Sequence, residues 1–151
     1  MDVLEIDTDA ARLDVDWIAR FLAEEAYWSR GIRPDVVRRA IAGSLCFGGY
    51  LGARQVAFAR VVTDGATVAY LADVFVHAEC RGRGYGGRLI EAVRAHAEVR
   101  AVRRVLLATA DAHAFYARFG FAAPARLERF MEILDVDAYV RADGAPQRAV
   151  A

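Results

Sequence analysis

The stretch RGRGYGG, residues 81–87, combines four glycines with two arginines immediately before a helix-like sequence. Backbone N–H groups at a helix N-terminus bind phosphate, because they lack a partner within the helix and point along its dipole. Arginine adds charge-assisted hydrogen bonds whose geometry suits a pyrophosphate. A purely structural turn is the alternative, but four glycines this close together are costly if their only task is to turn the chain. The stretch therefore predicts a pyrophosphate-binding loop.

Two other nucleotide motifs fit the loop less well. Gly82, Gly84 and Gly87 satisfy the dinucleotide pattern G-x-G-x-x-G, and Asp111 lies where a ribose-binding acid could fall. That pattern requires its first glycine directly after a strand, whereas HAECR separates this loop from the preceding apolar segment, and too few residues follow Asp111 to complete a doubly wound sheet. A Walker loop ends in Gly-Lys-Ser/Thr, where this chain has GGRL. We expect pyrophosphate binding without a catalytic magnesium ion.

A carboxylate, Asp73, stands within an otherwise apolar segment. A charge in such a place must be paired or functional. Two roles stay open for it: a general base or amine-binding group, and a structural salt bridge with one of the arginines. No spacing of histidines, cysteines and acidic residues suggests a metal site.

Hydrophobic periodicity predicts the elements that position these residues. Helical spacing indicates helices over residues 14–28 and 33–44, with Asp14 as the N-cap of the first and with Pro34 and Gly43 at the ends of the second. Further helices are expected over residues 86–97 and 111–120. Period-two patterns and intervening turn signals predict strands over residues 3–7, 45–51, 55–62, 67–77, 103–109 and 129–136.

This order of elements predicts a mixed α+β fold. Its sheet is antiparallel in the first strands, which are joined by short turns, and parallel after the glycine loop, with helices on both faces. The 151 residues suit a single domain. We place that domain at residues 1–137 and a polar C-terminal tail at residues 138–151.

The composition argues against several classes of protein. The net charge is zero, with 20 basic and 20 acidic residues, whereas nucleic-acid-binding domains usually carry a basic excess. The two cysteines form no disulfide framework, and the sequence shows neither a long apolar run nor a basic-then-apolar leader. We expect a soluble cytoplasmic protein that binds neither nucleic acid nor membrane.

Two motifs together resemble the GCN5-related N-acetyltransferases (GNAT superfamily). Arg81, Gly84 and Gly86 match the Arg/Gln-x-x-Gly-x-Gly/Ala acetyl-CoA motif, and AHAFYARFGF matches the second motif through Phe115, Tyr116, Gly120 and Phe121. The predicted strand order also matches that superfamily, so the resemblance spans residues 1 to about 136. One difference is Thr109, which stands where the superfamily often has an asparagine; the chain contains no asparagine at all. The substitution is expected to weaken one contact with the pantetheine arm.

The resemblance implies acetyl-CoA as the cofactor. Its diphosphate would lie on the loop amides, and its pantetheine arm would pair with the strand over residues 67–77, where that strand splays from the strand over residues 103–109. The amide of Phe75 or Val76 would stabilise the oxyanion. The residues expected to contact the cofactor are Val74, Phe75, Val76, Arg81, Gly82, Arg83, Gly84, Tyr85, Gly86, Thr109 and His113.

The resemblance also assigns catalytic and acceptor-binding residues. Tyr116 occupies the usual position of the general acid that protonates the departing thiolate; a core tyrosine with a satisfied hydroxyl is the alternative. Asp73 is the first candidate for the general base. Glu24 and Glu25 are further candidates, since the loop between the first two helices commonly borders the acceptor. Tyr27 and Trp28 would form an apolar or cation–π wall for an amine, or else belong to the core.

The implied function is an acetyl-CoA-dependent N-acetyltransferase that acts on the primary amine of a small molecule. One alternative is an acyltransferase that uses another acyl-CoA or a protein acceptor. Another is a catalytically silent module that senses acyl-CoA. The apolar strand expected at residues 129–136 is compatible with a homodimer.

Overall fold

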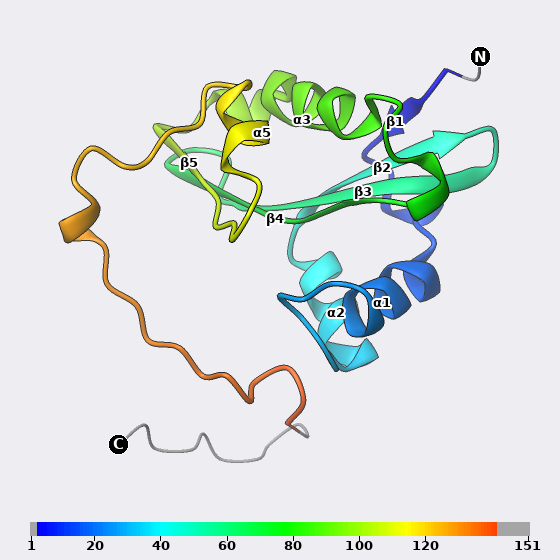
Figure 1. Ribbon diagram of the computed structural model, residues 1–151, viewed down its shortest axis with the longest axis horizontal. Coiled ribbons are helices and arrows are strands. Elements are labelled where there is room, and N and C mark those ends of the chain that lie inside the picture. Colours follow the sequence, from blue (N-terminus) through cyan, green and yellow to red (C-terminus); the bar gives the residue numbers. More distant parts are fainter. Residues whose placement is uncertain (1–2, 142–151) are drawn as a thin grey trace.

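The computed structural model describes residues 3–141, and the chain forms one five-stranded mixed sheet in the order β1-β2-β3-β4-β5 (Figure 1). Neighbouring strands are antiparallel from β1 to β4, and β4 and β5 are parallel. The predicted mixed α+β fold is therefore confirmed. The strands are β1 (Glu5–Asp7), β2 (Leu45–Leu51), β3 (Arg54–Thr63), β4 (Val68–Val76) and β5 (Arg104–Leu106).

Helices cover both faces of this sheet (Figure 1). One face carries α1 and α2, and the other carries α3 and α5. The helices are α1 (Val15–Glu24), α2 (Pro34–Ala42), α3 (Tyr85–Ala95), α4 (Ala97–Arg100) and α5 (His113–Ala117), with short 3₁₀ turns at Ala10–Arg12, Ala78–Cys80 and Leu127–Arg129. Within residues 3–141, none of these helices has the length and apolar character needed to cross a membrane.

The central strand β3 contributes to the core on both faces. Ala57, Ala59 and Val61 pack in the cluster beneath α3, while Phe58 packs in the cluster with α1 and α2. Successive side chains of a strand point to opposite faces, so a strand covered on both sides is apolar at almost every position. Arg60, in the same strand, lies on the α1–α2 face, next to the site described below.

The first helix is shorter than predicted. Asp14 caps its N-terminus as expected, accepting a hydrogen bond from the Trp17 N–H at 3.0 Å, but the helix ends at Glu24 instead of continuing to residue 28. The Ser29 hydroxyl and the Gly31 N–H bond to carbonyls of the last turn, at 2.7 and 2.9 Å. These bonds satisfy the terminal carbonyls and turn the chain away.

Three further boundaries differ from the prediction. The helix expected over residues 86–97 is divided at His96, whose extended backbone caps α4. The helix at 111–120 and the strand at 103–109 are shorter than predicted, as α5 and β5 show.

The strand predicted over residues 129–136 is wrong: this segment is extended but pairs with no strand of the described chain. It runs away from the body and returns near α2 (Figure 1), where the Arg33 N–H donates to the Tyr139 carbonyl at 3.0 Å. The domain boundary at residue 137 stays a prediction, and residues 142–151 of the expected tail lie outside the described part.

Candidate active site

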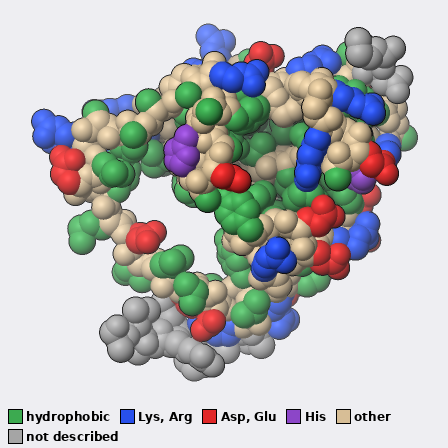
Figure 2. Space-filling view, in the orientation of Figure 1, with side chains coloured by type: hydrophobic (Ala, Val, Ile, Leu, Met, Phe, Trp, Pro, Cys, Tyr) green, Lys and Arg blue, Asp and Glu red, His purple; other side chains and the backbone are tan. Residues whose placement is uncertain are grey.

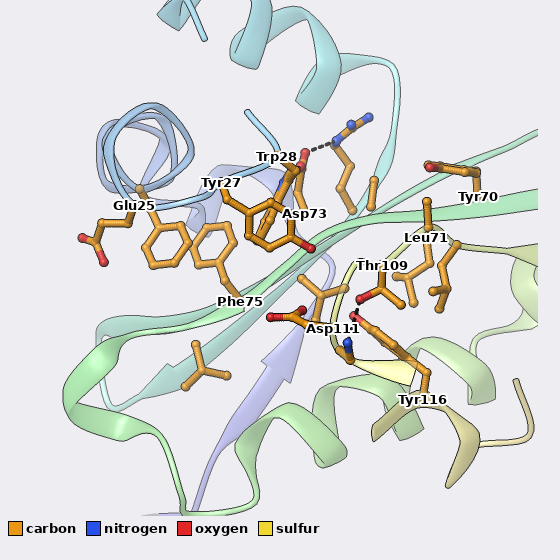
Figure 3. Close-up of a pocket in the computed structure, with 18 of the residues that line it drawn as sticks. Glu25, Tyr27, Trp28, Tyr70, Leu71, Asp73, Phe75, Thr109, Asp111 and Tyr116 are labelled. Carbon is orange, nitrogen blue, oxygen red and sulfur yellow. Dashed lines mark hydrogen bonds and ion pairs between the residues drawn. The ribbon is translucent and has the colours of Figure 1, made fainter. Parts of the chain in front are cut away.

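The pairing between β4 and β5 stops early. Val68, Ala69 and Tyr70 align with Arg104, Val105 and Leu106, and within the described residues the register continues no further. Beyond this point the two segments splay apart, and a cavity of about 600 Å³ opens between them (Figure 3). That volume is in the range of small-molecule sites. The open side of β4 leaves backbone groups available to an extended ligand.

Strand geometry indicates which backbone groups face this opening. The His77 N–H bonds to the Val56 carbonyl at 2.7 Å, toward β3. Because successive residues of a strand alternate, the Val76 N–H faces the cavity and the Phe75 N–H faces β3. Of the two amides predicted to stabilise the oxyanion, Val76 is the one with the required direction. Its carbonyl accepts a hydrogen bond from the Arg81 Nε at 3.2 Å.

The glycine loop leads directly into α3. Gly82 and Gly84 have positive φ angles of 76° and 78°, and a Cβ atom added to either would meet nothing within 4 Å. Gly84 is the N-cap of α3, and the first N–H bonded within the helix is that of Arg88. The Gly86 and Gly87 amides, in the first turn, therefore have no partner within the helix. The loop presents bare backbone and helix-terminal N–H groups, as a phosphate site requires.

Gly87 also has a packing role. An added Cβ would lie 3.3 Å from the ring of Phe119 at Gly87, a tight contact, and 3.5 Å from the ring of Phe115 at Gly86, an ordinary one. Both rings belong to the segment around α5. A small residue at Gly87 thus lets this segment approach the start of α3, which brings the two motifs together in space.

Tyr116 reaches from α5 toward Thr109 at the cavity (Figure 3). Burial, with a smaller contribution from the nearby Tyr27, raises the pKa of Tyr116 above its ordinary value. Within residues 3–141 the Tyr116 hydroxyl has no hydrogen-bond partner. The alternative of a core tyrosine with a satisfied hydroxyl therefore finds no support in the geometry. Thr109 lies in the turn before α5, where its hydroxyl accepts from the Ala112 N–H at 3.0 Å.

Asp73 lies at a bulge in β4. Phe58 aligns with Phe75 and Arg60 with Ala72, so β4 has one more residue than β3 between these pairs. Asp73 has a φ of 52°, the left-handed region that a non-glycine residue rarely adopts. Such a bulge redirects a side chain, and here it turns Asp73 toward the cavity (Figure 3).

Both carboxylate oxygens of Asp73 are engaged. One accepts from the Trp28 indole N–H at 3.0 Å, and the other accepts from the Arg60 Nε at 2.8 Å. The ion pair is largely buried, with 15% of the Arg60 side chain and 12% of the Asp73 side chain exposed. The structural salt bridge is therefore present, and it holds Trp28 as well. A base role for Asp73 stays a prediction.

The turn after α1 forms the wall opposite β5. Tyr27 and Trp28 meet edge to face, with ring centroids 5.2 Å apart, and the Tyr27 hydroxyl accepts from the Ala110 N–H at 3.1 Å. Both rings and Glu25 line the cavity. Tyr27 and Trp28 are 51% and 41% exposed, so neither ring is buried in the core.

The structure thus brings most of the predicted residues together. Those that line the cavity are Glu25, Tyr27, Trp28, Asp73, Val74, Phe75, Val76, Arg81, Thr109 and Tyr116. The others do not line it: Gly82, Arg83, Gly84, Tyr85 and Gly86 lie in the adjoining loop and helix start, and His113 is exposed at the start of α5. Glu24, named with Glu25 as a further candidate for the base, does not line the cavity either.

Sequence analysis missed several lining residues. Arg60, Tyr70, Asp111 and Tyr139 border the cavity, and of these Asp111 had been considered as a ribose-binding acid. Arg60 had a usable signal, a charge within an apolar strand, as Asp73 did. Tyr139 had none, because it comes from the segment expected to be tail.

Comparisons with known proteins agree with this geometry. Residues 42–123 match a family model described as the acetyltransferase (GNAT) domain. A candidate acetyltransferase of Gibberella zeae, FG08082, is 32% identical over 129 residues, which cover 70% of this chain and 71% of the relative.

Solved structures are similar over most of the chain. A candidate acetyltransferase of the gnat family from Xanthomonas campestris pv. campestris (xcc2953) is 47% identical, with a TM-score of 0.89, and the match covers 93% of this chain and 99% of that one. Glucosamine-6-phosphate N-acetyltransferase from Arabidopsis thaliana has a TM-score of 0.61 over 88% of this chain and 99% of its own, but only 12% identity, so it is similar in fold alone.

Proposed function

Because this chain belongs to the GNAT acetyltransferase family, we propose that it transfers an acetyl group from acetyl-CoA to the primary amine of a small molecule. Family membership supports acetyl transfer in general; the acceptor and the residue roles are our proposal. The observation that carries it is the cavity between β4 and β5, which has Arg81 and Val76 on one side, Tyr116 on another, and the Tyr27–Trp28 wall opposite.

The residues present fit acetyl-CoA, the thioester that supplies the acetyl group. The amides of the glycine loop and α3 would hold the diphosphate, together with Arg81 and Arg83. The cavity-facing side of Val74 to Val76 would pair with the pantetheine amides as an added strand does. Thr109 offers a ligand fewer hydrogen-bonding groups than an asparagine amide would, and its hydroxyl already accepts from the Ala112 N–H.

Tyr116 is the proposed general acid. Its hydroxyl has no protein partner in the described chain and faces the cavity. A phenol is protonated at neutral pH, and burial raises the pKa of Tyr116 further above its ordinary 10.0. It is therefore able to donate that proton to a departing thiolate. A silent sensing module would need no such donor, so this geometry favours the enzyme.

The chemistry of the cavity favours a cationic acceptor. Asp73 and Arg60 neutralise each other, and Arg81 lies toward the loop, so Glu25 and Asp111 leave acidic charge near the acceptor end. The exposed rings of Tyr27, Trp28 and Tyr70 can contact an alkylammonium through their faces. Such an amine has a pKa of about 10.4 and must lose its proton before it can attack.

Calorimetric titration with acetyl-CoA and with CoA tests the cofactor assignment. Wild type should bind both, and Gly84→Glu should lose binding, because it places bulk and negative charge in the loop. Gly52→Glu is a matched control: Gly52 also has a positive φ and open space around it, but it lies in the β2–β3 turn. Equal loss in both variants, or no binding by wild type, would reject the assignment.

The acceptor is then sought by following CoA release with a thiol reagent across a panel of small primary amines. Cys46 and Cys80 are buried and should contribute little background in the folded protein. Mass spectrometry of the product distinguishes an N-acetyl from an O-acetyl compound. Binding of acetyl-CoA without turnover on any amine, peptide or alcohol would favour the sensing module.

A further inference from the structure

A small apolar pocket, here called the core pocket, lies between α1, α2 and β3. Its volume is about 70 Å³, and its walls include Leu22 of α1, Val37 and Ala40 of α2, and Phe58 of β3. Leu22, Val37 and Phe58 are almost fully buried. Protein interiors are close-packed, and an apolar void costs stability because the atoms that line it lose contacts. The core pocket is therefore a departure from close packing that needs a cause.

A polar network keeps the core pocket from closing. The Arg60 guanidinium, on β3, donates to Asp73 at 2.8 Å and to the Ser44 hydroxyl at 3.2 Å. The Ser44 hydroxyl in turn donates to the Ala40 carbonyl, in the last turn of α2, at 2.6 Å. These bonds fix the distance between the end of α2 and the sheet. The helix cannot move inward to fill the void without breaking them.

The core pocket adjoins the active-site cavity. Arg60, Asp73 and Tyr139 line both spaces. Figure 3 shows Asp73 and Trp28 side by side at one end of the cavity, with Tyr116 at the other end. The core pocket therefore lies beyond the end of the cavity that is far from the proposed general acid.

The junction between the two spaces does not require a charged ligand. Asp73 and Arg60 form an ion pair, and the second oxygen of Asp73 already accepts from Trp28. A neutral part of a ligand therefore passes this point without leaving a charge unpaired. The walls beyond it favour an alkyl group, since burial of each methylene corresponds to a gain in affinity of about fourfold.

We propose that the core pocket receives the apolar end of the acceptor whose amine is acetylated in the cavity. The inference rests on the acetyl transfer proposed above and narrows its acceptor. Since a cavity of about 150 Å³ holds a benzene ring, the 70 Å³ present here holds about three carbon atoms. Asp73 precedes Val76, the proposed oxyanion donor, by three residues of β4, or roughly 10 Å at about 3.3 Å per residue. The acceptor is thus an elongated primary amine with a small alkyl group roughly 10 Å from its nitrogen.

Such a molecule has access to the cavity from solvent. Tyr27 and Trp28, on the cavity wall, are both exposed. In the space-filling view an open gap separates residues 127–136 from the body (Figure 2). Residues 127–136 therefore do not cover the cavity.

The first test compares kcat/KM for straight-chain primary amines, from butylamine to dodecylamine, each below its micellar concentration. Ala40→Leu adds three carbon atoms to the wall and should fill the core pocket. The ratio of kcat/KM for dodecylamine to that for butylamine should therefore fall by roughly 60-fold, the gain from about three buried methylenes. Ala42→Leu is the matched control, because Ala42 lies in the same helix but is exposed and does not line the core pocket. It should keep the wild-type ratio.

Methyl resonances of Leu22 and Val37 supply a readout that does not depend on acetyl transfer. Titration of wild type with dodecylamine should shift both in NMR spectra, whereas butylamine, which is too short to span the cavity, should shift neither. No shift with dodecylamine, or an Ala40→Leu variant that keeps the wild-type ratio, overturns the proposal even if amines are acetylated. A shift without turnover of any amine supports the core pocket as an alkyl-binding site and rejects acetyl transfer instead.

Discussion

The indole N–H of Trp28 donates to the carboxylate of Asp73 at 3.0 Å, linking the turn after α1 to the bulge in β4. The other oxygen of the same carboxylate accepts from Arg60. Asp73, a residue with a rarely populated backbone conformation, thus connects the turn that carries Trp28 with strand β3, which carries Arg60.

Trp28→Phe should remove this link while keeping an aromatic ring. We expect a loss of about 1–3 kcal/mol in the free energy of unfolding, because one oxygen of a largely buried carboxylate loses its partner. The KM for the acceptor should rise, with CoA affinity unchanged. Urea denaturation of Trp28→Phe, Asp73→Ala and the double variant measures the coupling. Additive losses would show that the hydrogen bond contributes nothing to stability.

Tyr116→Phe should lower kcat by roughly 10²–10⁴-fold and leave acetyl-CoA affinity unchanged. Tyr70→Phe, at another tyrosine lining the cavity, is the control and should retain activity. Since burial raises the pKa of Tyr116 above its ordinary 10.0, the phenol keeps its proton below that pH. In wild type the alkaline loss of kcat due to this group should therefore have its midpoint above pH 10. A decline that begins near neutral pH would assign the acid to another group.

Alanine should change the free energy of unfolding differently at two glycines near the start of α3. Gly84 has a φ of 78°, so Gly84→Ala should destabilise the ligand-free protein by about 1–2 kcal/mol. Gly86 lies inside α3, with ordinary contact distances around an added Cβ, so Gly86→Ala should be neutral or gain up to about 1 kcal/mol. Thermal and urea unfolding without ligand compare the two. Equal losses would mean that the loop has a different backbone conformation in solution.

Asp64, in the β3–β4 turn, should make the free energy of unfolding depend on pH. Its carboxylate accepts from the Ala66 and Thr67 N–H groups and from the Thr67 hydroxyl, and these bonds hold the pKa of Asp64 well below its ordinary 3.8. A group whose pKa is lowered in the folded state stabilises the fold above its unfolded-state pKa. That contribution disappears as the pH falls through the folded-state pKa. The difference in urea midpoint between wild type and Asp64→Ala should therefore be largest near neutral pH and should narrow in strong acid. A constant difference would contradict this role.

The sequence predicted most of the sheet because β2, β3 and β4 have strong alternating or continuous apolar patterns and clear turn signals. The end of α1 was not predictable from periodicity, because Tyr27 and Trp28 continue the helical spacing while Ser29 and Gly31 terminate the helix through bonds to its carbonyls.

The site residues that could be proposed from the sequence are those whose residue type alone is informative. The loop glycines, Asp73 and Tyr116 have such signals, and the structure places them around one cavity or beside it. The bulge at Asp73 had none, because it arises from the count of residues between two strand pairings. The unpaired state of residues 130–135 was equally hidden. Their sequence is that of a strand whether or not a partner strand lies within the same chain.

The register between β4 and β5 is short. Three aligned residue pairs hold the C-terminal part of the sheet to the rest within the described chain, and the cavity begins where they end. A ligand that lies between the splayed segments, paired as a strand would be, would bind only the folded state and would stabilise it. Its binding adds RT ln(1 + [L]/Kd) to the stability of the folded state. The melting temperature should therefore rise with the concentration of any ligand that binds in this way.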